Sequence, residues 1–87
     1  MSFRVVVHPD VVSACRKIRA RDPVRYEQVK KKIRLLLENP ESGKPLHPPL
    51  RGLWRVHIGH FVLVYEIDAK EHAIVLLRFV HHDEAYS

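Results

Sequence analysis

The sequence has little of what builds disulfide-linked, membrane-spanning or secreted proteins. It contains one cysteine, Cys15, so no disulfide can form within the chain. No apolar run approaches the roughly 18 residues that a membrane span requires. The first ten residues, MSFRVVVHPD, lack the apolar stretch and the small-residue cleavage site of a secretion signal. We therefore expect a cytoplasmic protein with no membrane partner.

The histidines do not form a recognisable metal-binding motif. There are seven of them, but no pair has the HxxxH or HExxH spacing that places two imidazoles on one helix face. The single cysteine also argues against a zinc site built from thiolates. We expect no metal and no small-molecule cofactor.

Composition predicts one small globular domain that covers residues 1–87. Hydrophobic residues make up 46% of the chain and charged residues 29%, which provides enough apolar surface for a single modest core. The net charge is +5, and segment 16–34 concentrates it, with nine lysines and arginines against two acidic residues. Such a cluster of one sign indicates a polyanionic partner, either nucleic acid or an acidic protein.

Apolar spacing predicts two helices followed by a sheet. Helices are expected at residues 9–20 and 23–38, because Pro9 and Pro23 suit a first helical turn and Asp22 suits an N-cap. Runs of β-branched and aromatic residues predict four strands, at residues 3–7, 53–58, 61–67 and 72–80. Residues 40–49 contain four prolines and are expected to form a loop. The order β-α-α-β-β-β predicts a two-layer α+β fold, with an N-terminal helical hairpin packed on one face of a mainly antiparallel four-stranded sheet.

The alternation within segment 53–58 separates its side chains into two sets. If Trp54, Val56 and Ile58 face the helices, Arg55 and His57 point to the opposite, uncovered face of the sheet. This arrangement places a cation and an imidazole close together on a solvent-facing surface.

The last strand directs further polar groups toward the same face. Arg78 and His82 are an even number of residues apart, so an extended chain would point them to the same face. Tyr86 follows closely enough to fold back near them. Cations, imidazoles and a phenol are the groups that metal-free RNA cleavage needs. One group takes the proton of a ribose 2′-OH, cations stabilise the charged phosphorane, and an acid protonates the leaving 5′-oxygen. The pattern therefore predicts an anion-binding site with titratable groups.

The segments that carry these residues resemble the RelE/ParE superfamily of toxins from toxin-antitoxin modules. Residues 50–67, LRGLWRVHIGHFVLVYEI, are similar to its Leu-x-Gly, its arginine-rich strand and its Gly-Tyr-Arg-x-x-Tyr. Residues 77–86, LRFVHHDEAY, are similar to its closing His-Arg-x-x-x-Tyr, and the opening FRVVVHP and the Asn39-Pro40 pair also fit. The resemblance implies a RelE-like fold and an mRNA interferase, a ribosome-dependent endoribonuclease that inhibits translation. It also implies that the partners are the ribosome, mRNA and a cognate antitoxin.

The resemblance and the charge pattern together indicate which residues act. The candidate catalytic residues are Arg55, His57, His81, His82 and Tyr86. The candidate RNA- and phosphate-binding residues are Arg51, Arg78, Lys30, Lys31 and Arg34. Val62 and His82 stand where the family pattern carries arginines, which leaves two alternatives open. These are a ParE-like inhibitor of DNA gyrase that acts without catalysis, and a catalytically degenerate member that only binds its antitoxin.

Overall fold

The computed structural model of the chain describes residues 2–47 and 52–85. In chain order the elements are β1 (Arg4–Val7), α1 (Pro9–Arg21), α2 (Pro23–Glu38), the 3-10 turn η1 (Pro40–Ser42), β2 (Lys44–Pro45), β3 (Leu53–Ile58), β4 (Phe61–Asp68), β5 (Ala73–His81) and the one-turn helix α3 (His82–Ala85). Both long helices and all four expected strands are present, each end within one residue of its expected place. No helix within the described residues is long and apolar enough to cross a membrane.

The sheet has five strands in the order β1-β5-β4-β3-β2. β1 runs parallel to β5, and the other neighbouring pairs are antiparallel. The expected count of four strands is therefore wrong by one, because Lys44 and Pro45 of β2 pair with Arg55 and Trp54 of β3. The prolines around β2 gave it the pattern of a loop. An edge strand tolerates proline because one side of its backbone needs no hydrogen bond from a neighbour.

Side-chain caps fix where both long helices begin. At α1, the Nδ1 atom of His8 accepts a hydrogen bond from the backbone N–H of Asp10 (3.1 Å). At α2, the Oδ1 atom of Asp22 accepts one from the backbone N–H of Arg25 (3.0 Å). A proline follows each cap, at a position where the helix needs no N–H donor. Because Asp22 ends α1 and also caps α2, the chain reverses within one residue and the two helices form a hairpin.

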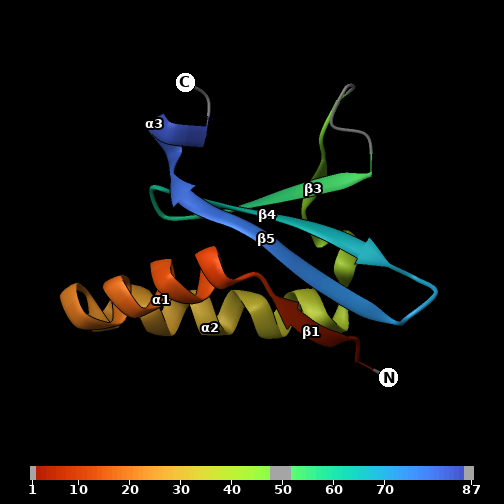
Figure 1. Cartoon of the computed structure of the whole chain (residues 1–87), viewed down its shortest axis with the longest axis horizontal. Helices are drawn as coiled ribbons and strands as arrows, with labels where there is room; N and C mark the ends of the chain where they lie inside the picture. The colour runs from red at the N-terminus through yellow and green to blue at the C-terminus, as the bar shows by residue number, and fades with distance from the viewer. Residues whose placement is uncertain (1, 48–51, 86–87) are drawn as a thin grey trace.

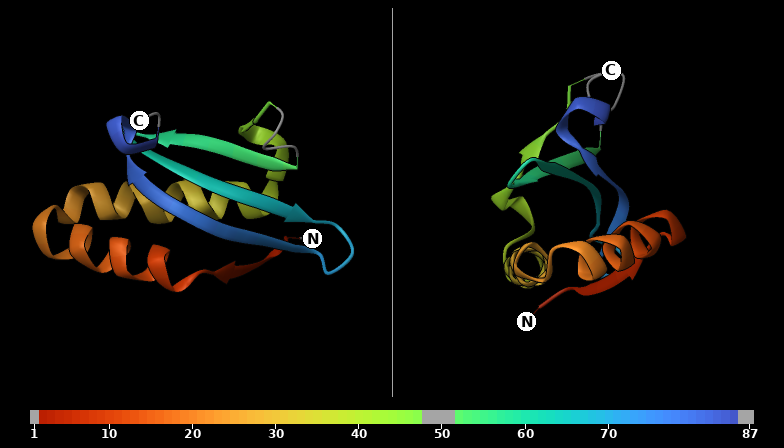
Figure 2. Two further views of the ribbon diagram at one scale, coloured as in Figure 1. Left: turned by 45° about the horizontal axis from the view of Figure 1, so that its top comes forward. Right: turned by 90° about the vertical axis from the view of Figure 1, so that its left-hand side faces the viewer.

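The core lies between this hairpin and one face of the sheet (Figure 1). As expected, Trp54, Val56 and Ile58 pack with the core, so Arg55 and His57 point to the opposite face. Figure 2 shows both long helices on the same side of the sheet and the short helix α3 on the other side. The main buried residues of the core are Val11 and Ile18 from α1, Val29 and Leu36 from α2, and Leu63, Tyr65, Ile74, Leu76 and Phe79 from the sheet.

Candidate functional site

Three cationic side chains stand in one row across the uncovered face, which we call the open face. The strand register makes Lys44 of β2, Arg55 of β3, Val64 of β4 and Arg78 of β5 successive neighbours. Side chains directly opposite each other on paired strands point to the same face, with Cβ atoms about 4.5–5.5 Å apart. The row therefore collects positive charge on the side of the sheet that faces away from the helices.

A β-bulge in β5 turns Arg78 toward the open face. Leu76 points into the core, and regular alternation would point residue 78 there as well. Leu77, however, has no partner on β4, because two consecutive β4 residues pair with Leu76 and Arg78. The extra residue reverses the alternation, so Phe79 returns to the core and Arg78 faces outward.

Two imidazoles lie beside this row, over an apolar floor. His57 pairs across the sheet with Val62, and Val62 pairs with Val80. The rings of His57 and His82 have their centroids 5.6 Å apart. Val62, at one of the two positions where the family pattern carries arginine, is 1% exposed and lies outside the main core cluster. The structure thus brings His57 and His82 to the same face as Arg55, as strand parity predicts.

The surroundings of His57 lower the pKa of its imidazole. Loss of hydration lowers the pKa of His57, and the positive charges of Arg55, His82 and Lys44 lower it further. Its pKa therefore falls below the usual histidine value of about 6.5, so the ring is mainly neutral at pH 7. A neutral imidazole on an open cationic face can accept a proton from a bound hydroxyl group.

Lys44 is a member of this site that sequence reasoning missed. It follows η1 in a proline-rich segment, where no strand parity could be assigned. Its position depends on Tyr65, whose hydroxyl donates to the carbonyl of Pro40 (2.6 Å) and accepts from the N–H of Gly43 (3.2 Å). A Cβ at Gly43 would collide with the Tyr65 hydroxyl and with the carbonyl oxygen of Arg55. The lack of a side chain at Gly43 therefore permits the close approach that sets Lys44 beside Arg55. In the sequence, the signal for this close approach was the glycine directly before Lys44.

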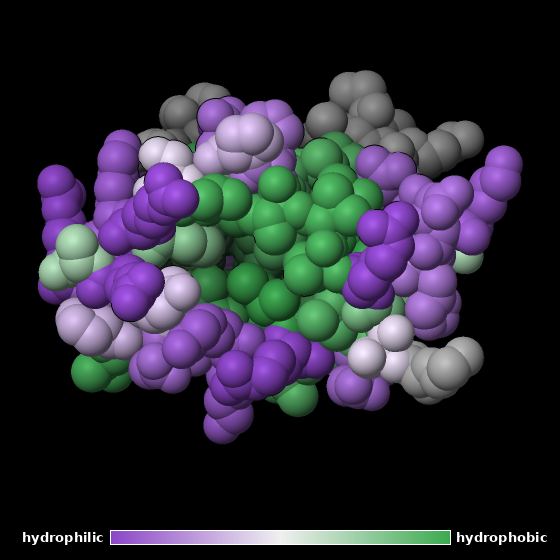
Figure 3. Space-filling model, turned by 60° about the horizontal axis from the view of Figure 1, so that its bottom comes forward, coloured by the Kyte–Doolittle hydropathy of each residue, from purple (hydrophilic) through white to green (hydrophobic). Residues whose placement is uncertain are grey.

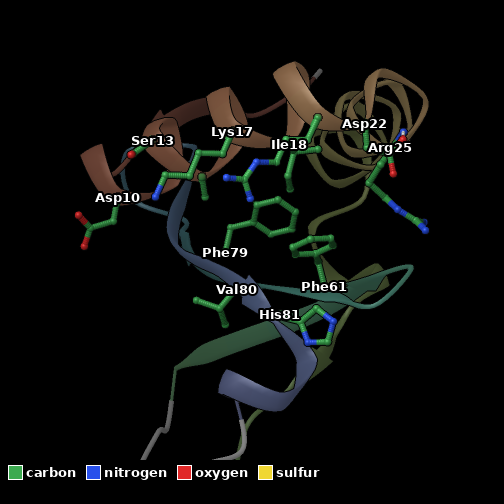
Figure 4. A pocket seen from close by; sticks show the side chains of 12 residues that line it. Asp10, Ser13, Lys17, Ile18, Asp22, Arg25, Phe61, Phe79, Val80 and His81 are labelled. Atoms are coloured by element: carbon green, nitrogen blue, oxygen red, sulfur yellow. Dashed lines mark hydrogen bonds between the residues drawn. The ribbon is translucent and has the colours of Figure 1, made fainter.

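His81 is the last residue of β5 and lies directly before His82, the first residue of α3. The His81 ring meets Phe61 edge-on, with centroids 5.7 Å apart. Phe61, Phe79 and His81 line a cleft of about 540 Å³, and in Figure 4 Phe61 and Phe79 point toward the helices while His81 lies nearer α3. The Asp83 carboxylate lies between the two histidines, 3.7 Å from Nδ1 of His81 and 3.9 Å from Nδ1 of His82. The Nδ1 atom of His81 also accepts a hydrogen bond from the backbone N–H of Asp83 (3.4 Å), which keeps His81 at the start of α3, close to His82.

The expected RNA-binding residues of α2 divide between two sides of the molecule. Lys30 pairs with Glu27 (2.9 Å) and lies 5.0 Å from the ring centroid of Tyr26, on the side of α2 toward α1. Lys31 instead lines a shallow hollow of about 350 Å³ together with His57, at the margin of the open face. Lys31 is therefore placed to extend the positive surface around the imidazoles.

The remaining expected residues are one neighbour of Lys31 and two that cannot be placed. Arg34 lines a second hollow together with Lys31 and Leu35, both of which also line the hollow at His57. Arg51 and Tyr86 lie outside the described residues. Within residues 2–47 and 52–85, no group of three or more histidine, cysteine or acidic side chains is arranged to hold a metal ion.

The arrangement is suited to a phosphodiester. Guanidinium groups present several N–H donors in a plane that matches phosphate oxygens, and an ammonium group adds a point charge. The neighbouring imidazoles can exchange protons near neutral pH. Because the side chains stand on a broad sheet face, the site suits a polymer strand laid across it better than an enclosed small molecule.

Two solved toxin-antitoxin complexes have toxins with this architecture. The RelBE2 toxin-antitoxin complex of Mycobacterium tuberculosis matches with a TM-score of 0.81 at 25% identity, covering 93% of this chain and 99% of that chain. The archaeal RelE-RelB complex of Pyrococcus horikoshii matches with a TM-score of 0.75 at 20% identity, covering 94% and 97%. The fold is therefore that of the RelE toxins.

The sequence comparisons establish the family. Residues 5–86 match the ParE toxins of type II toxin-antitoxin systems, parDE. The chain is also 31% identical over 85 residues to the protein named RelE4 of Methanocaldococcus jannaschii, which covers 97% of this chain and 90% of RelE4. The chain belongs to the RelE/ParE superfamily and is a toxin of a type II toxin-antitoxin system.

Proposed function

We propose that this toxin is a ribosome-dependent endoribonuclease that cuts mRNA without a metal. The observation that carries the proposal is the row of Lys44, Arg55 and Arg78 next to the paired imidazoles of His57 and His82. These are the groups needed to bind a phosphodiester, to accept a proton and to return one. Action on ribosomes also implies a cytoplasmic location.

In this mechanism the 2′-hydroxyl of one nucleotide attacks the phosphate that links it to the next. His57, neutral at pH 7, takes the hydroxyl proton while Arg55 and Arg78 stabilise the charge that develops on the phosphorane oxygens. The bond to the 5′-oxygen then breaks, and His82 or Tyr86 protonates that oxygen. The products are a 2′,3′-cyclic phosphate and a 5′-hydroxyl. His81 is a further candidate for this proton transfer, because Asp83 lies 3.7 Å from its Nδ1 atom and 3.9 Å from Nδ1 of His82.

The openness of the site supports a role for the ribosome. Both His57 and Arg78 are exposed, so an RNA strand could reach the row from solvent. Positioning of the reacting groups is worth several orders of magnitude in rate, so a second surface must supply it. An mRNA held on the ribosome is already positioned, and the net charge of +5 favours approach to ribosomal RNA.

Cleavage on purified, mRNA-programmed ribosomes tests this proposal directly. The wild-type toxin should produce cuts that primer extension maps within the coding region. Arg55→Ala should slow the cutting about 10²- to 10³-fold, because a donor to the developing charge is lost. Lys70→Ala, which removes a cation from the exposed β4–β5 turn, is the matched control. Intact mRNA after incubation with the wild-type toxin would overturn the proposal.

We also propose a cognate antitoxin as the partner. The matching structures from Mycobacterium tuberculosis and Pyrococcus horikoshii are both toxin-antitoxin complexes. Co-expression of the short reading frame beside the toxin gene should restore growth of cells that make the toxin. Growth arrest that this neighbour does not relieve would contradict the assignment.

A second candidate function is inhibition of DNA gyrase without catalysis. The family match to ParE toxins favours it, as does the buried Val62 at a position where the RelE pattern carries an arginine. A gyrase supercoiling assay with the purified toxin separates the two functions. Inhibition of supercoiling with intact mRNA on ribosomes would establish the gyrase function. Normal growth during expression would instead indicate a degenerate member that only binds its antitoxin.

A further inference from the structure

The cleft lined by Phe61, Phe79 and His81 lies at the end of the sheet where β4 begins and β5 ends. Its volume of about 540 Å³ is within the range of roughly 300–1,000 Å³ that is usual for ligand pockets. Residues of α1 and of the start of α2 form its other side. We call this cavity the end cleft, and the functions proposed above leave it without a ligand.

Aromatic rings form a connected series along one wall of the end cleft. The rings of Phe61 and Phe79 have their centroids 5.2 Å apart, and His81 meets Phe61 edge-on. The ring of His60 stacks on that of His81, with centroids 6.1 Å apart. Phe79 is buried, but Phe61 is partly exposed and His81 is exposed, so a flat molecule in the cleft can contact both rings. Nucleobases stack on such rings, because every base has a π-face.

This aromatic wall differs from the apolar surface elsewhere on the molecule. Figure 3, viewed from the side of the helices and β1, shows hydrophobic side chains bordered by hydrophilic ones. Among the described residues, the large hydrophobic side chains that are exposed are all aliphatic, such as Val5 and Leu35. Accessible rings instead gather at the end cleft, which suits a planar ligand.

Two cations of α1 border the end cleft. Lys17 and Arg21 are four residues apart, so both lie on the face of the helix that lines it. Among the described residues, no acidic side chain forms an ion pair with either of them. Cations that contact phosphates and rings that contact bases are the combination by which proteins bind single-stranded nucleic acid.

Two carboxylates also line the end cleft, at its margins. Oδ1 of Asp22 accepts the backbone N–H of Arg25 at the start of α2. Asp10 lies 3.7 Å from Nδ1 of His8, and in Figure 4 its carboxylate points away from the phenyl rings. A nucleobase can donate amino hydrogens to a carboxylate, whereas a bare phosphate ion can only be repelled by one. The cleft therefore suits a whole nucleotide better than inorganic phosphate.

The end cleft opens beside the groups proposed to protonate the leaving oxygen. His81 lines the cleft and directly precedes His82, and the Asp83 carboxylate lies within 4 Å of Nδ1 of both, at 3.7 and 3.9 Å. In the proposed mechanism that oxygen is the 5′-oxygen of the nucleotide after the cut. This nucleotide must therefore lie against the histidines, next to the entrance of the cleft.

We propose that the end cleft binds the nucleotide that follows the cut in the RNA strand. Its base would lie against Phe61 and His81, and the phosphate on its 3′ side would lie near Lys17 and Arg21. This inference rests on the nuclease function proposed above. It adds a substrate-binding site beyond the open face and a dependence on the base that follows the cut.

The first test measures binding of the toxin to ribosomes programmed with mRNA whose 2′-hydroxyl groups are methylated, which blocks cleavage. An abasic nucleotide is moved through this mRNA one position at a time. At one position it should weaken binding of the wild-type toxin about tenfold, because a stacked base is lost. Phe61→Leu should respond to that position less than about twofold, since no ring remains for the base to lose.

Phe3→Leu is the matched control for Phe61→Leu. Phe3 is likewise a partly buried phenylalanine packed against the core, but it stacks on His72 and does not line the end cleft. It should respond to the abasic nucleotide as the wild type does, and thermal unfolding shows whether each variant is folded. An abasic scan without effect at any position, or with equal effect in Phe61→Leu and the wild type, would overturn the proposal.

The second test uses the exposed cations, whose removal does not disturb the core. Arg21→Ala should weaken binding of a short methylated RNA about fivefold and reduce the slope of log affinity against log salt by about 0.7, the value for one single-strand phosphate contact. Arg16→Ala is the matched control, because Arg16 is an exposed arginine of α1 that does not line the end cleft. It should change neither quantity. Equal behaviour of the two variants would contradict a phosphate contact at the cleft.

A competitor distinguishes RNA from a free nucleotide as the ligand. Adenosine 5′-monophosphate should displace the short RNA only at far higher concentration than unlabelled RNA does, because it lacks the phosphates that contact the open face. Displacement at equal concentrations would assign the end cleft to a free nucleotide and would overturn the RNA assignment.

The outcomes separate this inference from the proposed nuclease function. If the wild-type toxin leaves mRNA intact but its response to the abasic nucleotide is lost in Phe61→Leu, the nuclease function fails and the end cleft stands as an RNA-binding site. If the wild-type toxin cuts mRNA while no position of the abasic scan affects binding, the end-cleft assignment fails and the nuclease function stands.

Discussion

On the open face, cations stand in the middle of the surface above a floor of valines; in the end cleft, aromatic rings form one wall and cations stand at the border. The first arrangement follows from regular alternation at Arg55 and from the bulge at Leu77, which turns Arg78 outward. The second follows from the helical spacing of Lys17 and Arg21, which places both on the face of α1 that lines the cleft. The two surfaces therefore differ in where positive charge stands relative to apolar side chains.

The largest loss of mRNA cleavage is expected when the proposed base is removed from the open face alone. His57→Ala should lower mRNA cleavage on purified ribosomes about 10²- to 10⁴-fold, because no neutral imidazole is left at that position to take the 2′-OH proton. The response of toxin binding to an abasic nucleotide, which reports on the end cleft, should not change. His47→Ala, which removes an exposed histidine beyond β2, is the control. Cleavage at the wild-type rate would show that another group accepts the proton.

A smaller effect is expected at the edge of the cationic row. Lys44→Ala should reduce cleavage roughly 10- to 100-fold, the usual worth of one hydrogen bond to a charged group. Lys44→Arg should retain most of the activity, because it keeps the charge beside Arg55. Single-turnover cleavage on ribosomes measures both variants, with Lys70→Ala as the control. If Lys44→Ala cuts normally, the row that binds phosphate is limited to the two arginines.

Much of this fold could be predicted because its signals are local. Proline and aspartate at Pro23 and Asp22 mark a helix start through backbone geometry and capping, and α2 begins where they indicate. Alternation in β3 likewise predicted that Arg55 and His57 share the open face. When the alternate residues of a strand are buried on one face, the residues between them must point to the opposite face.

The parts that could not be predicted depend on contacts distant in sequence. The bulge at Leu77 lies in a run that is apolar on both parities, so nothing local shows where the alternation reverses. β2 requires the hydroxyl of Tyr65, about twenty residues away, to hold its segment against the sheet. His81 entered the candidate site through family resemblance, and nothing local in the sequence indicated its hydrogen bond to the backbone of α3.

A stability measurement sharpens the link between the core and the open face. Tyr65→Phe should lower the free energy of unfolding by about 1–2 kcal/mol, because the Pro40 carbonyl and the Gly43 N–H lose their shared partner. Urea denaturation measures this change. Tyr26→Phe is the control, since the described interactions of Tyr26 are made by its ring. Cleavage by Tyr65→Phe should also fall, because the segment that presents Lys44 loosens; full stability together with full activity would contradict this positioning role.

The smallest expected effect is a shift in the titration of His57. Because the folded pKa of His57 lies below its usual value, cleavage should be constant near pH 7 and fall as the pH drops through that pKa, when the ring gains a proton. Lys44→Gln removes one of the positive charges that lower this pKa, so the pKa should rise part of the way toward about 6.5 and the acid limb should move to higher pH. The loss of hydration and the charges of Arg55 and His82 remain, so the shift should be only partial. NMR titration of the His57 ring protons measures it, with Lys70→Gln as the control. A pKa that stays fixed or moves down would show that the field of the cationic row does not reach this imidazole.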